Sequence, residues 1–206
     1  MSSTTYISID VAVRSLAIGV YKLKQIKNID SMKDENSITM NDNLNSIIQP
    51  IFMKVYDINE GSKVKETSII DKAKSLKVTL HDLDFNIRED IEGEDIKVLI
   101  EYQMNANHGA NAIFNMICYH FSDRYPIEIM KPAMKNKIYL HPTLTLSTFL
   151  GSCSSNYQAN KQHTKYNMLY FLTITDRLKI VSDIKNKNLD DIADTFMQCL
   201  SYHLHL

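Results

Sequence analysis

The sequence lacks the features of membrane, secreted and zinc-binding proteins. It contains no run of about 18 apolar residues, so we expect no transmembrane helix. It does not open with a basic segment followed by an apolar one, so we expect no secretory signal. The three cysteines are odd in number and far apart: Cys118, Cys153 and Cys199. Because none belongs to a CxxC pair, they exclude a zinc ribbon and a disulfide framework, and they favour a reducing compartment.

The chain also lacks tryptophan and an excess of charge of either sign. The formal net charge is −1 over 206 residues, which gives no support to a nucleic-acid partner. The charge does not exclude such a partner, because a basic face can be balanced by an acidic face elsewhere. With 44% hydrophobic and 23% charged residues, the composition is that of an ordinary globular protein, and the length suffices for one domain with a sizeable core.

The first part of the chain is rich in strand patterns. Residues 5–11 alternate apolar and polar side chains, and residues 16–21 form a second β-rich segment after a short link that suits a hairpin. A third such segment at residues 47–58 completes a meander. The polar residues 22–45 before it predict a surface excursion.

The remaining patterns alternate between helix and strand. We expect Ser62 to cap a helix with one apolar face: Ile69, Ala73, Leu76, Leu80 and Leu83. Its lysines are expected to be solvated: Lys63, Lys65, Lys72, Lys74 and Lys77. The following segments predict an acidic loop at 88–95, a buried strand at 96–100, a helix at 112–121, a strand at 127–130, loops around a short helix at 134–157, a helix at 161–173 and a final helix from 189. This order indicates an α/β domain with a mixed sheet.

The segment at residues 189–196 concentrates acidic side chains. Asp191 and Asp194 are three residues apart, so a helix places both on one face, and Asn188 or Asp190 can cap its start. Two ionised carboxylates held side by side repel each other unless a cation or a proton lies between them. Oxygen-rich sites without histidine suit Mg²⁺ or Mn²⁺. For an isolated motif of this kind, a solvated acidic first turn is the favoured alternative.

Two further carboxylates lie on strands that the sequence predicts. Asp10 lies within the first expected strand, and Glu101 ends the apolar strand at 96–100. A carboxylate at the end of a buried strand needs a partner, and strand ends in α/β sheets are where sites form. Together with the pair on the last helix, these groups could hold two divalent ions about 3.5–4 Å apart, the arrangement that promotes phosphodiester cleavage.

Four motifs resemble those of a known family. They are Ile7-Ser8-Ile9-Asp10, Val98-Leu99-Ile100-Glu101-Tyr102-Gln103, Tyr157-x-x-x-Lys161 and Leu189-Asp190-Asp191-Ile192-Ala193-Asp194. In order and context they are similar to those of the RuvC-type Holliday junction resolvases of the RNase H/retroviral-integrase superfamily, and more closely to the poxvirus resolvases. The resemblance implies a single RNase H-like domain over residues 1–206. Its fold would be α/β, with a mixed central sheet, an N-terminal antiparallel three-strand meander and helices on both faces.

The resemblance also implies the site residues. The metal ligands would be Asp10, Glu101, Asp191 and Asp194, and the active-site lysine would be Lys161. Lys165, one turn further on, is the alternative for the role of active-site lysine. The implied cofactor is Mg²⁺ or Mn²⁺, with two ions in each active site.

The implied activity is that of a crossover junction endodeoxyribonuclease. Such an enzyme makes paired symmetric nicks in a four-way (Holliday) DNA junction, leaving 5′-phosphate and 3′-hydroxyl ends, in recombination and in the resolution of viral replication intermediates. Two cuts imply two active sites and therefore a homodimer. The expected location is cytoplasmic, with no membrane partner. Two alternatives remain: another RNase H-like nuclease acting on RNA–DNA hybrids or flap DNA, and a catalytically silent junction-binding protein.

The chain departs from the family pattern after the first motif. Ala12, Arg14 and Ser15 stand where the family usually has Gly, Lys and Asn. Two other features have two interpretations each. The lysines after the strand at 127–130 either follow a DNA backbone or lie in a solvated loop: Lys131, Lys135 and Lys137. One face of the helix at 112–121 is either a dimer surface or core: Ile113, Met116, Ile117 and Phe121.

Overall fold

The computed structural model describes most of the chain. The described residues are 3–12, 15–24, 33–34, 37–38, 47–59, 61, 67–101, 108–132, 135, 138, 140–141, 143–144 and 146–204. Within them, no helix is both long and apolar enough to cross a lipid bilayer.

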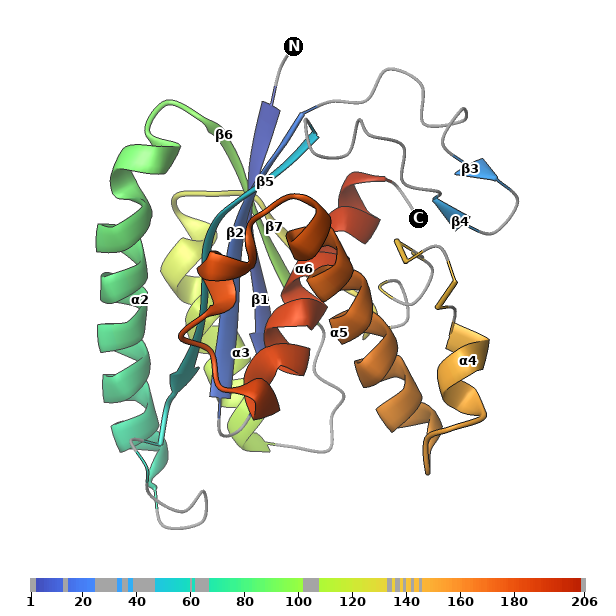
Figure 1. Ribbon diagram of the computed structural model, residues 1–206. Helices are drawn as coiled ribbons and strands as arrows, with labels where there is room; N and C mark the ends of the chain where they lie inside the picture. Colours follow the sequence, from blue (N-terminus) through green and yellow to red (C-terminus); the bar gives the residue numbers. More distant parts are fainter. Residues whose placement is uncertain are drawn as a thin grey trace.

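Five strands form one mixed sheet (Figure 1). In sheet order they are β5 (Ile48–Asp57), β2 (Ser15–Lys24), β1 (Ser3–Val11), β6 (Asp95–Glu101) and β7 (Ile127–Met130). The first three pair antiparallel, whereas β1, β6 and β7 run parallel. Pro50 is tolerated within β5 because β5 is an edge strand with one neighbour. The predicted meander and mixed sheet are thereby confirmed.

Helices cover both faces of this sheet (Figure 1). On one face lie α2 (Ile69–Ile91) and α3 (His108–Ser122). On the other lie α6 (Leu189–His203) and α5 (Asn156–Ile174), with α4 (Leu146–Leu150) beside α5. Two short 3₁₀ turns connect α5 to α6: η3 (Leu178–Val181) and η4 (Asn186–Asn188). A separate two-residue pairing joins β3 (Lys33–Asp34) to β4 (Ser37–Ile38) within the predicted surface excursion.

Strict alternation along the strands produces two cores. On β1, Ile7 and Ile9 belong to the core under α2 and α3, whereas Tyr6 belongs to the core under α5 and α6. On β6, Ile100 faces the first core and Leu99 the second. Because successive side chains of a strand point to opposite faces, any polar group at an even position of β1 must lie under α5 and α6.

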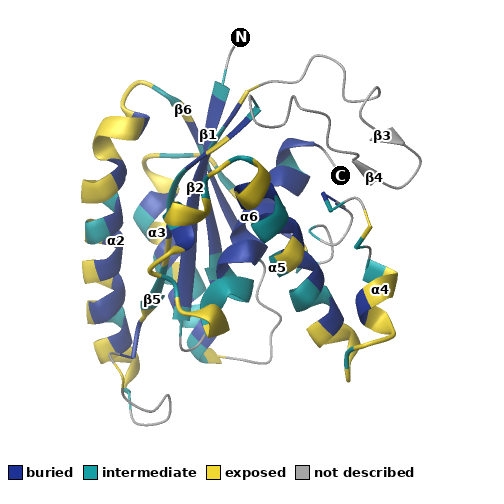
Figure 2. Ribbon diagram, in the orientation of Figure 1, coloured by how far each residue is buried: buried dark blue, intermediate teal, exposed yellow. Residues whose placement is uncertain are grey.

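The helix α6 is the most deeply buried helix of the described chain (Figure 2). Residues 192–201 are all buried, since the sheet covers one side of the helix and α5 covers the other. Apolar residues therefore occur on several sides of this helix, including Ile192, Phe196 and Leu200. A helix held in this way has little freedom to shift relative to β1 and β2.

Gly19 leaves room on β2 for the Tyr21 side chain, which contacts α6. A side chain at this position would overlap the phenol ring of Tyr21, two residues along the same face of β2. The Tyr21 ring is fully buried, and its hydroxyl is 2.7 Å from the Thr195 hydroxyl on α6. Gly19 therefore makes room for the ring that connects the sheet to α6.

Several local predictions were wrong. Ser68 rather than Ser62, which lies outside the described residues, caps α2 by accepting a hydrogen bond from the Asp71 amide. Residues 88–91 of the predicted acidic loop are helical, because Ile87 and Ile91 continue the buried face; Gly93, at φ 76°, follows the helix.

Two side chains of α2 also differ from expectation. Lys72 is buried because it lies one turn from Leu76 on the core face, where its aliphatic stem is covered. Ile69 is exposed because it begins the helix, before the buried stretch. On α3, burial of Ile113 and Phe121 identifies the face proposed as core or dimer surface as core.

Replacing Gly19 by alanine should destabilise the protein. The added methyl group must displace the buried ring of Tyr21, and overpacking of this kind costs about 1–3 kcal/mol in unfolding free energy. Urea denaturation followed by circular dichroism measures this change. Gly151→Ala is the matched control, because a side chain there meets no neighbouring atom. Equal stability of the two variants would contradict the packing role of Gly19.

Candidate active site

Strand pairing brings Asp10 and Glu101 together. In the parallel pair β1–β6, Ile9 is aligned with Ile100, so the next residues along the two strands are Asp10 and Glu101. Both follow the alternation that directs Tyr6 and Leu99 toward α6. The two carboxylates therefore lie side by side on the α6 face, at the ends of adjacent strands.

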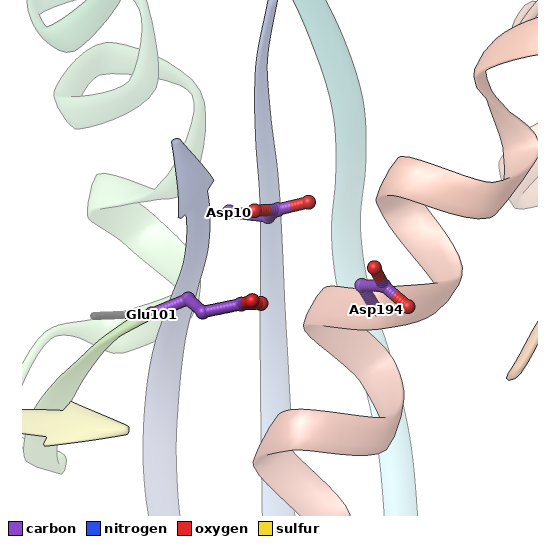
Figure 3. Close-up of side chains that lie close together, drawn as sticks. All are labelled: Asp10, Glu101 and Asp194. Atoms are coloured by element: carbon purple, nitrogen blue, oxygen red, sulfur yellow. The ribbon is translucent and has the colours of Figure 1, made fainter. Parts of the chain in front are cut away.

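The third carboxylate comes from α6. Asp194 is 1% exposed, and one carboxylate oxygen from each of Asp10, Glu101 and Asp194 lies within 4.8 Å of the other two. Figure 3 shows these side chains extending from β1, β6 and α6 toward the same space between sheet and helix. We call these three residues the acidic cluster.

Two lysines supply positive charge to the acidic cluster. Lys161 on α5 places its Nζ 2.7 Å from Asp194 Oδ2 and 3.9 Å from Asp10. Lys135, which follows β7, places its Nζ 2.7 Å from Asp194 Oδ2 and 2.8 Å from Glu101. Both side chains are largely buried, so these contacts are stronger than those of surface ion pairs.

Asp191, the other predicted acid of α6, lies beside the cluster rather than within it. Its carboxylate accepts hydrogen bonds from Lys161 at 3.1 Å and from the Ser15 hydroxyl at 3.3 Å. Lys161 therefore connects Asp191 to Asp194. The structure brings the five predicted site residues into one network, with three of the four acids in mutual contact range and Asp191 at its edge. Their roles in metal binding and catalysis stay predictions.

Burial and crowding of negative charge change the ionisation of Asp10. Burial, and after it the carboxylates of Glu101 and Asp194, raise the pKa of Asp10 to about 8, although Lys135 and Lys161 oppose the shift. Burial alone would lower the pKa of each lysine, but the facing carboxylates outweigh it. They raise the pKa of Lys135 to about 12 and hold that of Lys161 well above its ordinary value. Both lysines are therefore cations at neutral pH.

The donor set of the acidic cluster fits a hard divalent cation. Its donors are carboxylate oxygens at close range, and a bound cation would relieve the repulsion between them. No histidine or cysteine belongs to the described group of potential ligands, which favours Mg²⁺ or Mn²⁺ over zinc.

The structure distinguishes between the two candidate lysines on α5. Lys161 contacts the acids, whereas the ammonium of Lys165 lies 5.9 Å from the ring centre of Tyr166. Near the start of α6, Asn188 occupies the cap position, but its side chain makes no capping hydrogen bond. Its side chain therefore does not cap the helix in the way that the sequence suggested.

Lys135 is the site residue that the sequence did not identify. It was grouped with Lys131 and Lys137 as either a DNA contact or part of a solvated loop. Lys131 is exposed, Lys137 lies outside the described residues, and Lys135 is buried against two acids. The only available signal was position: β7 is parallel to β6, so residues after both strands gather at the same edge of the sheet.

An open cavity of about 570 Å³ adjoins the site. Ser15 and Asp191 lie on its wall nearest the acidic cluster, β5 supplies another wall, and Lys185 and Lys187 lie in the segment leading into α6.

Of the other departures from the family pattern, Arg14 lies outside the described residues. The amide of Ala12 donates to the Ser15 carbonyl at 3.0 Å and helps to close the β1–β2 hairpin.

Comparison with solved structures identifies the fold. The fowlpox virus Holliday junction resolvase superimposes with a TM-score of 0.56 at 16% identity, covering 98% of this chain and 99% of that chain. Its complex with Holliday junction DNA gives 0.54 at 17% identity, covering 97% and 96%. RuvC of Thermus thermophilus gives 0.50 at 10% identity, covering 96% and 94%. No family model and no curated protein sequence matches the chain. The predicted resemblance to RNase H-like resolvases is therefore confirmed for the fold.

The raised pKa of Asp10 predicts a pH-dependent loss of stability. Between about pH 4 and about pH 8 the folded state holds a proton on Asp10 that the unfolded chain has released. Because the folded state then binds more protons, the free energy of unfolding contributed by this group falls as the pH rises through that window. In Asp10→Asn, measured with a chelator present, the decline in unfolding free energy between about pH 5 and about pH 8 should be shallower than in the wild type.

Asp82 provides the control for this pH measurement. Hydrogen bonds from Lys54 and Tyr56 lower the pKa of Asp82, so its contribution to stability changes only in more acidic solution. Asp82→Asn should therefore keep the wild-type decline above about pH 5. If the unfolding free energies of the wild type and Asp10→Asn changed with pH in parallel, Asp10 would hold no proton in this window.

Proposed function

We propose that this chain, which has the fold of the Holliday junction resolvases, is a metal-dependent endonuclease that cuts four-way DNA junctions. The observation that carries the proposal is the convergence of Asp10, Glu101 and Asp194 at adjoining strand ends and the buried helix. A fold alone permits many functions, so the chemistry of this cluster is the decisive part.

The acidic cluster supplies ligands for divalent cations. Asp10, Glu101 and Asp194 would hold Mg²⁺ or Mn²⁺, and Asp191 at the cluster edge would contribute to a second ion. When bound, such ions supply Lewis acidity and a water of lowered pKa for phosphodiester hydrolysis. Burial of Asp194 and Glu101 excludes bulk water from their side of the cluster and fixes the orientation of the carboxylates.

The two lysines would act on the DNA phosphate. Lys161 and Lys135 approach the acids from different segments and remain charged at neutral pH. Each could turn toward a phosphate and offset the negative charge that develops on its oxygens during cleavage. The adjoining cavity beside Asp191 provides open space next to the acids for a bound strand.

The family resemblance extends the proposal to products and assembly. Paired symmetric nicks would leave 5′-phosphate and 3′-hydroxyl ends. Two opposed strands must be cut, so we propose a homodimer with two-fold symmetry and one site in each subunit. The cellular setting that we propose is cytoplasmic recombination or the processing of branched viral replication intermediates.

A labelled synthetic four-way junction tests the function directly. With Mg²⁺ or Mn²⁺ the wild type should produce paired cuts, and with a chelator it should produce none. Linear duplex, flap DNA and RNA–DNA hybrid are the competing substrates, and preference for the hybrid would reassign the enzyme to another class of nuclease. Asp194→Asn, which removes a central ligand, should abolish cutting and leave a junction complex in a gel-shift assay. Cutting by this variant would exclude the acidic cluster as the active site.

Removing the lysine on α5 should affect cleavage more than binding. Lys161→Ala should lower the cleavage rate by about 10²–10³-fold, the usual effect of losing one group that stabilises charge in the transition state. Lys165→Ala is the matched control one turn away, where the ammonium lies over Tyr166. Single-turnover rates on the junction, with affinities from gel shifts, separate the two effects. A larger loss in Lys165→Ala than in Lys161→Ala would reverse the assignment.

A further inference from the structure

The two oxygens of Asp194 have different partners. Oδ2 lies 2.7 Å from the ammonium groups of both Lys161 and Lys135, on the side of the acidic cluster. Oδ1 accepts a hydrogen bond from the Thr164 hydroxyl at 2.9 Å. Thr164 is fully buried on α5, less than one turn after Lys161. One helix therefore supplies a cation to one oxygen of Asp194 and a neutral donor to the other.

Hydrogen bonding to the helix backbone does not by itself account for this contact. Threonine hydroxyls in helices commonly donate to a carbonyl three or four residues earlier, and the Lys161 carbonyl lies 3.1 Å from Thr164 Oγ1. The hydroxyl has one proton, and a carboxylate is a stronger acceptor than a peptide carbonyl. The distance from Thr164 Oγ1 to Asp194 Oδ1, 2.9 Å, is also shorter than its distance to the Lys161 carbonyl oxygen. The proton therefore goes to Asp194.

We propose that Thr164 is a positioning residue for the metal site. Its hydroxyl holds Oδ1 away from the acidic cluster and thereby directs Oδ2 toward Asp10 and Glu101, where a divalent cation would bind. This inference rests on the proposed function, since it requires the cluster to bind a metal. A carboxylate fixed in one orientation binds an ion without first losing rotational freedom, and partners of metal ligands commonly contribute about 10–100-fold to metal affinity.

Ser15 offers a comparison within the same site. Its hydroxyl donates to Asp191 at 3.3 Å, and the Asp191 side chain is 25% exposed. Water can replace a donor at such an exposed carboxylate, whereas at Asp194, with 1% exposure, it cannot readily do so. The hydroxyl of Thr164 should therefore matter more for metal binding than the hydroxyl of Ser15.

Thr164→Val is the informative variant, because valine keeps the shape of threonine and removes only the hydroxyl. Thr164→Ser keeps the donor and is the matched control. Mn²⁺ binding is measured by calorimetry without DNA, on full-length protein. We expect Thr164→Val to bind Mn²⁺ at least tenfold more weakly than the wild type, Thr164→Ser to bind within about threefold of it, and Ser15→Ala to show the smaller loss.

Thermal unfolding with and without Mn²⁺ separates positioning from general stability. A structural role alone would lower the melting temperature equally in both conditions, whereas positioning also reduces the rise in melting temperature that Mn²⁺ produces. If Thr164→Val does not fold, Thr164→Cys replaces it, since the thiol is a weak donor of similar size, and the same tenfold loss is expected.

The outcomes distinguish the two proposals. Unchanged Mn²⁺ affinity in Thr164→Val, or in Thr164→Cys where that variant is needed, overturns the role of Thr164 and leaves the proposed function standing. Absence of Mn²⁺ and Mg²⁺ binding by the wild type overturns both. Asp194→Asn, analysed in parallel, should lose Mn²⁺ binding, which assigns the measured signal to the acidic cluster.

Discussion

Repulsion between three carboxylates is the constraint on which this structure depends. Asp10, Glu101 and Asp194 approach one another within 4.8 Å in a space largely closed to water, where like charges are poorly screened. Folding must therefore supply positive charge, protons or a bound cation at this place. Lys161 and Lys135 reach it from separate segments, and burial, together with the carboxylates of Glu101 and Asp194, still raises the pKa of Asp10 despite these two ammonium groups. A divalent cation bound at the cluster, as proposed, would offset the remaining negative charge.

The rigidity of α6 follows from this constraint. A helix that presents a carboxylate to two others must be prevented from moving away from them. The sheet prevents this movement through Tyr21, whose ring lies over Gly19 and whose hydroxyl contacts Thr195, next to Asp194. On the opposite side, α5 contributes the cation and the hydroxyl that hold Asp194 itself. The apolar burial around α6 thus provides the energy that keeps mutually repelling groups together.

The fold could be predicted where a signal was local and periodic. Alternation revealed β1, and the apolar run ending at Glu101 revealed β6, so two acids could be placed on strands before their contact was known. The pairing that brings them together is a relation between distant segments; their position at strand ends suggested a common site, and the family resemblance supported it. Lys135 had no periodic signal because it follows β7 in an irregular segment. The acidic residues after Arg88 concealed the helix end, since charge on the outer face of α2 outweighed the buried Ile91 in the sequence pattern.

Two of the departures from the family pattern after the first motif, Ala12 and Ser15, have structural explanations. Ala12, in place of glycine, closes the hairpin through its amide, which needs no special backbone conformation. Ser15, in place of asparagine, donates to Asp191 and so holds the acid nearest to the adjoining cavity. The proposed site would require carboxylates at two strand ends and on one helix, together with hydrogen-bond donors for them, and different side chains can provide those donors. In this chain those donors are the Ser15 hydroxyl, the Thr164 hydroxyl and the ammonium group of Lys161.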